Sequence, residues 1–290
     1  MSGYPIVVIT GATSGIGQIA AVEIAKLGAK LVLTARNEER AKIAERLIKE
    51  VSPDTEVDFY FGDLSLMKDT RRIGLEIKEN YPKVDVLINN AEIHGFEQRI
   101  TSEGFAEMIA VNYLTPWLLT DLLKESLIKA ENGKIINVAS ESSRNHGKLK
   151  LPDDLIDTSP FTAKGSSEVY GKTKLLNIMF TYELARQLSN IKVTANTLNP
   201  GFNNTGLGRD LWFSTILGKI LKLLNIGNPK RGADLIVRLA TEPKFNNITG
   251  RYFTVGTGAE IEPVYPGNEK LMQQSLWKIT EELLLDYTKK

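Results

Sequence analysis

Cysteine is absent from this sequence of 290 residues, and histidine occurs only twice, at His94 and His146. The lack of cysteine excludes disulfides, thiolate catalysis and cysteine-ligated metals. Two separated histidines do not supply a histidine-rich metal site either. We therefore predict no bound metal, and neither histidine is a strong catalytic candidate.

The sequence also lacks an excess of either charge, because 36 basic side chains face 35 acidic ones and give a formal net charge of +1. No long block of like charge occurs. Nothing here favours nucleic acid as a partner. Chemistry on a small molecule is the better expectation.

Long apolar runs are missing as well. No uncharged stretch approaches the roughly 20 residues of a membrane helix, and the apolar run at 6–9 is too short for a signal peptide. With 42% hydrophobic and 24% charged residues, the composition is that of a soluble globular protein. We expect a cytoplasmic protein without an integral membrane segment, although it could associate peripherally with a membrane.

Short aliphatic runs alternate with longer segments of helical period, which is the pattern of βα units. The predicted strands are residues 6–10, 30–35, 56–61, 84–89, 134–139, 192–198 and 251–255. The predicted helices are residues 15–27, 38–51, 66–81, 103–129, 167–188 and 231–240. The pattern predicts an α/β fold, a doubly wound parallel sheet of about seven strands with helices on both faces. Residues 1–290 should form a single domain.

Two segments interrupt this alternation. Residues 145–168 are rich in Lys, Asp, Pro and Ser, and residues 203–228 form an apolar insertion that contains Trp212 and Phe213. Ligands bind beyond the carboxyl ends of the strands in such sheets, so both insertions could border the substrate pocket. The last segment, 267–287, could be a terminal helix or an interface, and a homo-oligomer is compatible with the sequence.

A glycine-rich turn directly follows the first predicted strand and opens the first predicted helix. Glycines at such a place permit a tight turn and a close approach of backbone N–H groups to a pyrophosphate at the helix N-terminus. This context is typical of a Rossmann-type dinucleotide site. The residues expected to bind the cofactor here are Gly11, Thr13, Ser14, Gly15, Ile16 and Gly17.

The end of the second strand indicates which nicotinamide cofactor is bound. An acidic residue there contacts the ribose hydroxyls of NAD, but this sequence has Arg36 instead. A guanidinium can pair with a 2′-phosphate, so NADP(H) is favoured over NAD(H). Arg36 could alternatively be a solvated residue at a helix entrance.

Tyr170 and Lys174 lie four residues apart in a predicted helix, on one face. A nearby cation favours the phenolate form, so this pair could donate or accept a proton near neutral pH. Such a pair also occurs by chance in many helices, and it gains weight only from its context.

That context is the order of motifs along the chain. Tyr170 and Lys174 follow the glycine-rich turn, Asn89-Asn90-Ala91, Asn112 and Ser140, and they precede Asn199-Pro200-Gly201-x3-Thr205. This order resembles the short-chain dehydrogenase/reductase family over about two-thirds of the chain. The joint occurrence of these motifs is highly specific.

The resemblance implies a catalytic set. Tyr170 would be the general acid/base, and Ser140 would polarise the substrate oxygen, with Ser142 and Ser143 as alternatives for that hydroxyl. Lys174 would hold the nicotinamide ribose and lower the pKa of the tyrosine, and Asn112 would complete the set through a water relay. Asn112 and Ser140 could also be mere caps.

The resemblance also implies further cofactor contacts. Asp63 and Leu64 match the family position that contacts adenine, although Asp63 alone would look like a helix N-cap. Asn89 and Ala91 would line the nicotinamide half, and the segment containing Pro200, Gly201 and Thr205 would cradle the carboxamide.

The long interval between Ser140 and Tyr170 resembles the retinol-dehydrogenase-like branch of the family. This implies an NADP(H)-dependent oxidoreductase that interconverts a carbonyl and an alcohol, with a lipophilic ketone or aldehyde as the expected carbonyl and reduction as the expected direction. The apolar insertion agrees with a lipophilic substrate, but its side chains could also only pack against the sheet. The alternatives are a catalytically silent NADP(H)-binding sensor or scaffold and a sugar-nucleotide epimerase or dehydratase.

The sequence departs from the family pattern where Asn-Asn-Ala-Gly is usual, because Glu92 replaces the glycine. A carboxylate at this position would add bulk and negative charge beside a phosphate-bearing cofactor. Either the side chain turns away, into solvent or the active-site mouth, or cofactor binding is weaker than usual, and we expect the former. Thr115, where glycine is often found, has no predicted function.

Overall fold

Seven parallel strands form one sheet in the computed structural model, which describes residues 4–201 and 228–289. The strands are β1 (Ile6–Ile9), β2 (Lys30–Ala35), β3 (Val57–Phe61), β4 (Val86–Asn89), β5 (Gly133–Val138), β6 (Val193–Asn199) and β7 (Tyr252–Thr254). Their order across the sheet is β3-β2-β1-β4-β5-β6-β7. The order reverses between β1 and β4, so the loops after these two strands meet at the switch point of the sheet.

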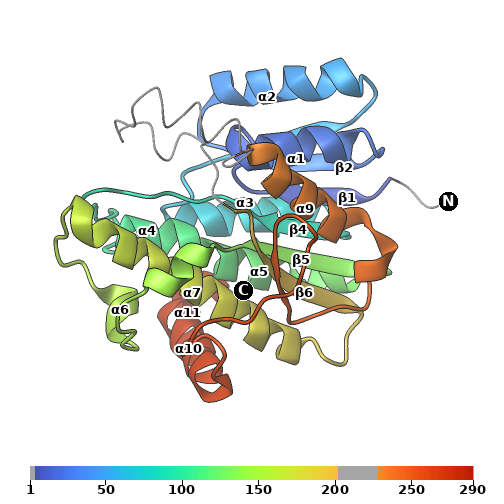
Figure 1. Ribbon diagram of the computed structural model, residues 1–290. Coiled ribbons are helices and arrows are strands. Elements are labelled where there is room, and N and C mark those ends of the chain that lie inside the picture. The colour runs from blue at the N-terminus through green and yellow to red at the C-terminus, as the bar shows by residue number, and fades with distance from the viewer. Residues whose placement is uncertain (1–3, 202–227, 290) are drawn as a thin grey trace, which may run out of the picture.

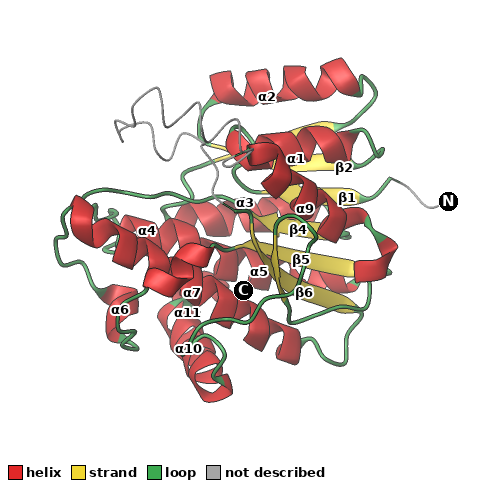
Figure 2. Ribbon diagram, in the orientation of Figure 1, coloured by secondary structure: helices red, strands yellow, loops and turns green. Residues whose placement is uncertain are grey.

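Helices cover both faces of this sheet, as Figures 1 and 2 show. The helices on one face are α1 (Gly15–Ala25), α2 (Glu38–Val51) and α9 (Pro229–Thr241), of which α1 and α9 lie side by side. The main helices on the other face are α3 (Met67–Asn80), α5 (Thr115–Ile128) and α7 (Ala163–Gln187). The prediction of a doubly wound α/β sheet is confirmed.

The alternation of side chains along β1 explains why both faces must be covered. Val7 and Ile9 pack against α1 and α9, whereas Val8 packs against the α3, α5 and α7 layer. All three residues are at most 2% exposed, as expected for a strand with apolar side chains on both sides.

The shorter elements lie in the connections. They are α4 (Glu107–Ile109), the π-helical turn η1 (Ala110–Leu114), the 3₁₀ helix η2 (Glu141–Asn145), α6 (Asp153–Ile156) and the 3₁₀ helix η4 (Pro243–Phe245). The predicted helix over 103–129 is therefore wrong in its first turn. Gly104 has a φ of +85°, and the Glu103 carboxylate instead accepts hydrogen bonds from the backbone N–H groups of Met67 and Lys68 at the start of α3.

The C-terminal helices α10 (Lys270–Leu283) and α11 (Leu285–Thr288) pack beside α7 and α5, at the foot of the molecule in Figure 1. Trp277 lies with its ring centroid 5.6 Å from that of Trp117 and 6.0 Å from that of Phe180. The Tyr113 and Thr280 hydroxyls share a buried hydrogen bond of 2.6 Å. The segment 267–287 is thus largely helical and covers part of the core.

Two further predictions concern the insertions and the membrane. Helix α7 begins four residues before the predicted position 167, so the first insertion is shorter than expected. The second insertion, 203–228, lies almost entirely outside the described residues. None of the helices in the described ranges is both long and apolar enough to cross a membrane.

Candidate active site

Segments that follow six different strands carry predicted site residues, and Asn112, Tyr170 and Lys174 lie in η1 and α7. Because all the strands are parallel, their carboxyl ends meet at one edge of the sheet. The glycine-rich turn follows β1, Arg36 follows β2, Asp63 follows β3, Ala91 follows β4, Ser140 follows β5 and Pro200 follows β6. The topology therefore brings the predicted cofactor and catalytic residues of the described ranges to the same side of the molecule.

The turn after β1 has a backbone that requires glycine. Gly11 and Gly15 have φ angles of +68° and +60°, which L side chains rarely adopt. A Cβ atom on Gly17 would lie only 2.6 Å from the carbonyl oxygen of Gly11. Ser14 precedes α1 and makes no side-chain capping hydrogen bond among the described residues, so it does not block the helix N-terminus. This cradle fits the phosphates of a dinucleotide.

Asn90 holds the turn against the end of β4. Its Nδ2 group donates to the carbonyl oxygens of Thr10 at 2.9 Å and Gly11 at 3.2 Å. The backbone N–H groups of Asn90 and Ala91 both donate to the Thr10 hydroxyl at 3.0 Å. Asn90 is missing from the predicted cofactor residues, although it is the middle of the Asn89-Asn90-Ala91 motif. Its role in bracing the turn depends on a contact across about 80 residues that spacing cannot reveal.

The neighbouring loops present Arg36 and Asp63. Arg36 is exposed directly after β2. The Asp63 carboxylate accepts a hydrogen bond from the backbone N–H of Ser65 at 2.9 Å, and the Leu64 carbonyl accepts one from the Thr115 hydroxyl at 2.6 Å. Since Glu103 caps α3, the alternative that Asp63 is the helix N-cap is wrong. Thr115, which had no predicted function, anchors the Asp63-Leu64 loop.

Tyr170 and Lys174 lie on the same face of α7, as their spacing predicts. Their side chains are buried, with Tyr170 8% and Lys174 1% exposed. The Lys174 ammonium lies 5.4 Å from the centre of the Tyr170 ring and donates to the carbonyl oxygen of Val138 at 3.0 Å. The pair is therefore anchored at the end of β5.

Glu92 lies between these two groups. Its Oε2 atom accepts a hydrogen bond from the Tyr170 hydroxyl at 3.0 Å and forms an ion pair with the Lys174 ammonium. Of the two expected directions, solvent or the active-site mouth, the side chain does not take the first, because it points to the catalytic pair. The physical reason is the burial of Lys174, because a buried ammonium requires an opposite charge and hydrogen-bond acceptors.

The pKa of Tyr170 differs from the sequence-based expectation for the same reason. Burial raises this pKa well above its ordinary value, and the charge and hydrogen bond of Glu92 raise it further. The resemblance implies that Lys174 lowers this pKa, but burial and the Glu92 carboxylate shift it upward instead. The phenol is thus protonated at neutral pH.

Asn112 and His94 support the segment that carries Glu92. The Asn112 side chain accepts from the backbone N–H of Ile93 at 2.8 Å and donates to the carbonyl oxygen of Ile93 at 2.9 Å. The His94 ring stacks on the Tyr170 ring with centroids 4.5 Å apart, and its Nε2 atom lies 3.3 Å from the Ser166 hydroxyl. Asn112 is thus a clamp on this segment, and its water relay stays a prediction.

Sequence reasoning set His94 aside as a weak candidate, and no spacing signal connects it to Tyr170. Burial lowers the pKa of His94, whereas Glu92 raises it and Lys174 lowers it. The ring is therefore neutral near pH 7, as an aromatic neighbour of the phenol.

Ser140 lies directly after β5, at the start of η2. Its hydroxyl donates to the Ser142 hydroxyl and accepts from the backbone N–H of Ser142, both at 3.1 Å. Ser143 is only 1% exposed, so of the three serines it is the least accessible to a substrate. Ser140 and Ser142 stay alternatives for the hydroxyl role.

Three other residues of the predicted motifs, Asn199, Asn89 and Thr205, differ in what the structure shows of them. The Asn199 carboxamide oxygen joins the loops after β5 and β6, because it accepts from the backbone N–H groups of Glu141 at 3.3 Å and Gly201 at 3.1 Å. The Asn89 side-chain amide donates to Asn137 and Thr120 at 2.8 and 3.1 Å, so its nitrogen is occupied within the core. Thr205 lies outside the described residues.

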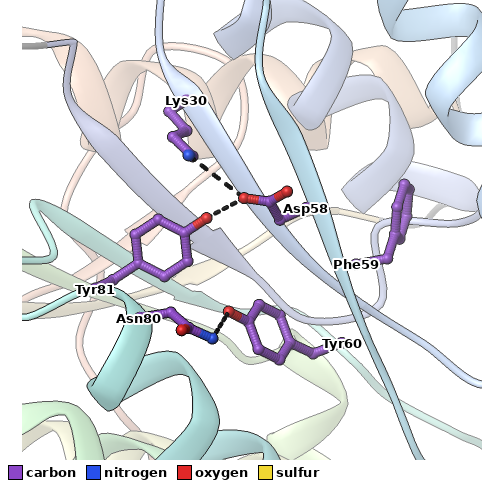
Figure 3. A pocket seen from close by; sticks show the side chains of 6 residues that line it. All are labelled: Lys30, Asp58, Phe59, Tyr60, Asn80 and Tyr81. Carbon is purple, nitrogen blue, oxygen red and sulfur yellow. Dashed lines mark hydrogen bonds and ion pairs between the residues drawn. The ribbon is translucent and has the colours of Figure 1, made fainter.

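An open polar pocket of about 510 Å³ lies elsewhere, where β2 and β3 begin (Figure 3). Its polar groups are paired with one another: Asp58 contacts Lys30 and Tyr81, and the Asn80 amide donates to the Tyr60 hydroxyl at 2.9 Å. Phe59 points to the other side of β3. Since this pocket lies at the amino ends of the strands, it is separate from the catalytic pair.

Known proteins resemble this chain in sequence and in structure. A family model described as short chain dehydrogenase matches residues 5–151. Retinol dehydrogenase 14 of Homo sapiens is 32% identical over 96% of this chain and 85% of its own length. Polyprenol dehydrogenase of Homo sapiens is 31% identical over 98% of this chain and 86% of its own length.

Among solved structures, a short-chain dehydrogenase of Shigella flexneri complexed with NADP has a TM-score of 0.67 and 22% identity, and the match covers 87% of this chain and 97% of that one. At this identity, the similarity bears on the fold alone.

Proposed function

This chain belongs to the short-chain dehydrogenase/reductase family, within its retinol-dehydrogenase-like branch, and from this premise we propose that it is an NADP(H)-dependent reductase of lipophilic ketones or aldehydes. The coarser part of this function, an oxidoreductase that interconverts carbonyls and alcohols with a nicotinamide dinucleotide, follows from the family. The proposed role as a reductase rests mainly on one observation, which is the buried and protonated Tyr170 beside Lys174 at the end of β5.

The phosphate-binding part of the cofactor fits the glycine-rich turn. Gly11 and Gly15 adopt positive φ angles, and Gly17 packs closely against Gly11 and Asn90, so the turn is tight at the N-terminus of α1, where an anion would bind. Thr13, Ser14 and Ile16 belong to the same cradle, and the loops containing Asp63-Leu64, Asn89 to Ala91, and Pro200-Gly201 would border the rest of the cofactor.

The choice of NADP(H) over NAD(H) is supported by Arg36. Its exposed guanidinium follows the strand next to β1, where a 2′-phosphate would accept charge-assisted hydrogen bonds. NADP is also the dinucleotide bound to the Shigella flexneri protein of the same fold.

The residues of this chain supply the proton chemistry. When bound, NADPH supplies the hydride. Tyr170 donates its hydroxyl proton to the substrate oxygen, and Ser140 or Ser142 donates a hydrogen bond to that oxygen. Lys174 stabilises the developing phenolate and would contact the nicotinamide ribose, while Asn112 fixes the loop that faces the pair.

A lipophilic substrate is supported by relatives rather than by a described pocket. The names of two relatives specify retinol and polyprenol, both of which are long apolar alcohols. We propose the same chemical class for this chain.

The function can be tested by following NADPH absorbance at 340 nm with a panel of apolar aldehydes, ketones and quinones, and with NADH in parallel. We expect carbonyl-dependent oxidation that is faster with NADPH than with NADH. Tight NADPH binding without turnover of any carbonyl would instead indicate a silent sensor or scaffold.

A further inference from the structure

One carboxylate oxygen joins the two reactive groups of this site. The Glu92 Oε2 atom contacts both the Tyr170 hydroxyl and the Lys174 ammonium, and Glu92 stands where the family usually has glycine. We propose, on the basis of the proposed function, that Glu92 is a positioning residue that keeps Tyr170 protonated and thereby makes it a proton donor over the whole neutral pH range.

The position of Glu92 is fixed by the structure around it. Asn112 binds both backbone polar groups of Ile93, and Asn112 is itself fully buried. Its carbonyl oxygen accepts a further hydrogen bond from Asn177 at 2.7 Å. On the other side, His94 stacks on the ring of Tyr170. Ile93 and His94, the two residues after Glu92, are therefore held, and this keeps the Glu92 carboxylate beside the pair.

Among the described residues, few charged groups face Tyr170. Glu92 and His94 approach it from the segment after β4, and Lys174 lies on its own helix. Lys172 of the same helix pairs with Asp154 of α6, and in the neighbouring η2 and α4 Glu141 pairs with Arg144 and Glu107 with Arg99. Burial makes the largest contribution to the raised pKa of Tyr170, and Glu92 and Lys174 are the full charges beside the phenol in the described part of the chain.

Removing the charge of Glu92 would leave burial as the remaining cause that raises the pKa of Tyr170. Lys174, only 1% exposed, would then be the full charge beside the phenol among the described residues, and a nearby cation lowers a phenol pKa. With Glu92 present, the carboxylate neutralises the ammonium and accepts the hydroxyl hydrogen, and both effects favour the protonated phenol.

The consequence concerns the two directions of the reaction. In reduction, the substrate carbon accepts a hydride from the bound cofactor, the O–H bond of Tyr170 breaks, and the proton bonds to the substrate oxygen. The phenolate then regains a proton from water. Oxidation of the alcohol begins with the phenolate form, so Glu92 restricts it to alkaline pH and extends the alkaline limit of reduction.

The test is a direct titration of Tyr170 in the cofactor-free protein by NMR of ¹³Cζ-labelled tyrosine. The chain has nine tyrosines, and the signal of Tyr170 is the one lost in Tyr170→Phe. Glu92→Gln removes the charge and keeps the size, and Glu97→Gln makes the same change at an exposed position of the same segment. We expect the midpoint to fall by at least about one pH unit in Glu92→Gln and to stay unchanged in Glu97→Gln.

An unchanged midpoint in Glu92→Gln, or a wild-type midpoint at or below about 10, would overturn the proposal. If Glu92→Gln does not fold, Glu92→Gly provides the same comparison with the residue usual in the family. The titration requires no turnover, so it distinguishes a wrong role for Glu92 from a wrong overall function. With an active substrate, the alkaline limit of reduction should shift downward by the same interval as the NMR midpoint.

Discussion

Replacing Gly17 by alanine should weaken both the fold and cofactor binding, for reasons that the distances specify. The new Cβ atom would lie 2.3 Å from the Asn90 side-chain nitrogen and 2.6 Å from the Gly11 carbonyl oxygen, closer than real Cβ atoms come. Asn90 must then move and lose its hydrogen bonds to the carbonyl oxygens of Thr10 and Gly11, which contribute about 1 kcal/mol each.

Overpacking adds about 1 to 3 kcal/mol, and the higher helix propensity of alanine offsets about 1 kcal/mol. The free energy of unfolding should therefore fall by about 2 to 4 kcal/mol. Because the turn carries the phosphate cradle, NADPH affinity should fall at least about tenfold, which corresponds to about 1.4 kcal/mol of binding free energy.

Chemical unfolding and NADPH fluorescence titration measure these two effects. Gly165→Ala is the matched control, since its Cβ atom would meet only the Phe161 Cβ atom, at an ordinary 3.4 Å. The control should bind NADPH like the wild type. Wild-type affinity in Gly17→Ala would refute the reasoning that the close contact of Gly17 with Asn90 and Gly11 shapes the phosphate cradle.

Three other changes test separate parts of the structure. Arg36→Ala should weaken NADPH binding by about 10- to 100-fold, as expected for a lost charged hydrogen bond, and leave NADH binding nearly unchanged in parallel titrations; equal losses for both cofactors would argue against a 2′-phosphate contact. Because burial lowers the pKa of His94, its neutral form stabilises the fold above about pH 6.5, and this contribution is lost as the pH falls below that value. His94→Phe keeps the ring, so its Tm should drop less than that of the wild type between pH 7.5 and 5.5; an equal drop would contradict this assignment. Trp277→Ala should lower the free energy of unfolding by about 3 kcal/mol, because its ring packs on α5 and α7, whereas Leu271→Ala, at a residue 79% exposed, should change it little; similar losses in the two variants would mean that α10 contributes little to the core.

The sequence predicted the architecture well, because the strands and the turns between them are encoded by residues close together in the chain. Both faces of β1 are buried, so its residues read as a continuous apolar run, and the glycine-rich turn after it marks the first helix. The family resemblance drawn from the order of motifs is confirmed by the comparisons. The start of the helix over 103–129 was missed because Glu103 caps a helix that begins at Met67, a contact between distant segments.

The site was harder to predict from the sequence, because several of its contacts also join distant segments of the chain. The spacing of Tyr170 and Lys174 is local and was read correctly, but the contact of Glu92 with them spans about 80 residues. Glu92 in place of glycine signalled a departure from the family pattern. The direction in which its side chain points, however, depends on how deeply Lys174 is buried. The stacking of His94 on Tyr170 likewise has no pattern in the sequence.

The central claim is that Tyr170 supplies the proton in an NADPH-dependent reduction. The most direct test compares wild type and Tyr170→Phe for NADPH binding by fluorescence and for carbonyl-dependent NADPH oxidation at 340 nm. We predict that the variant binds NADPH nearly as tightly as the wild type and loses about 100- to 10,000-fold in turnover, the usual contribution of a general acid. Undiminished turnover in Tyr170→Phe would contradict the proposed mechanism.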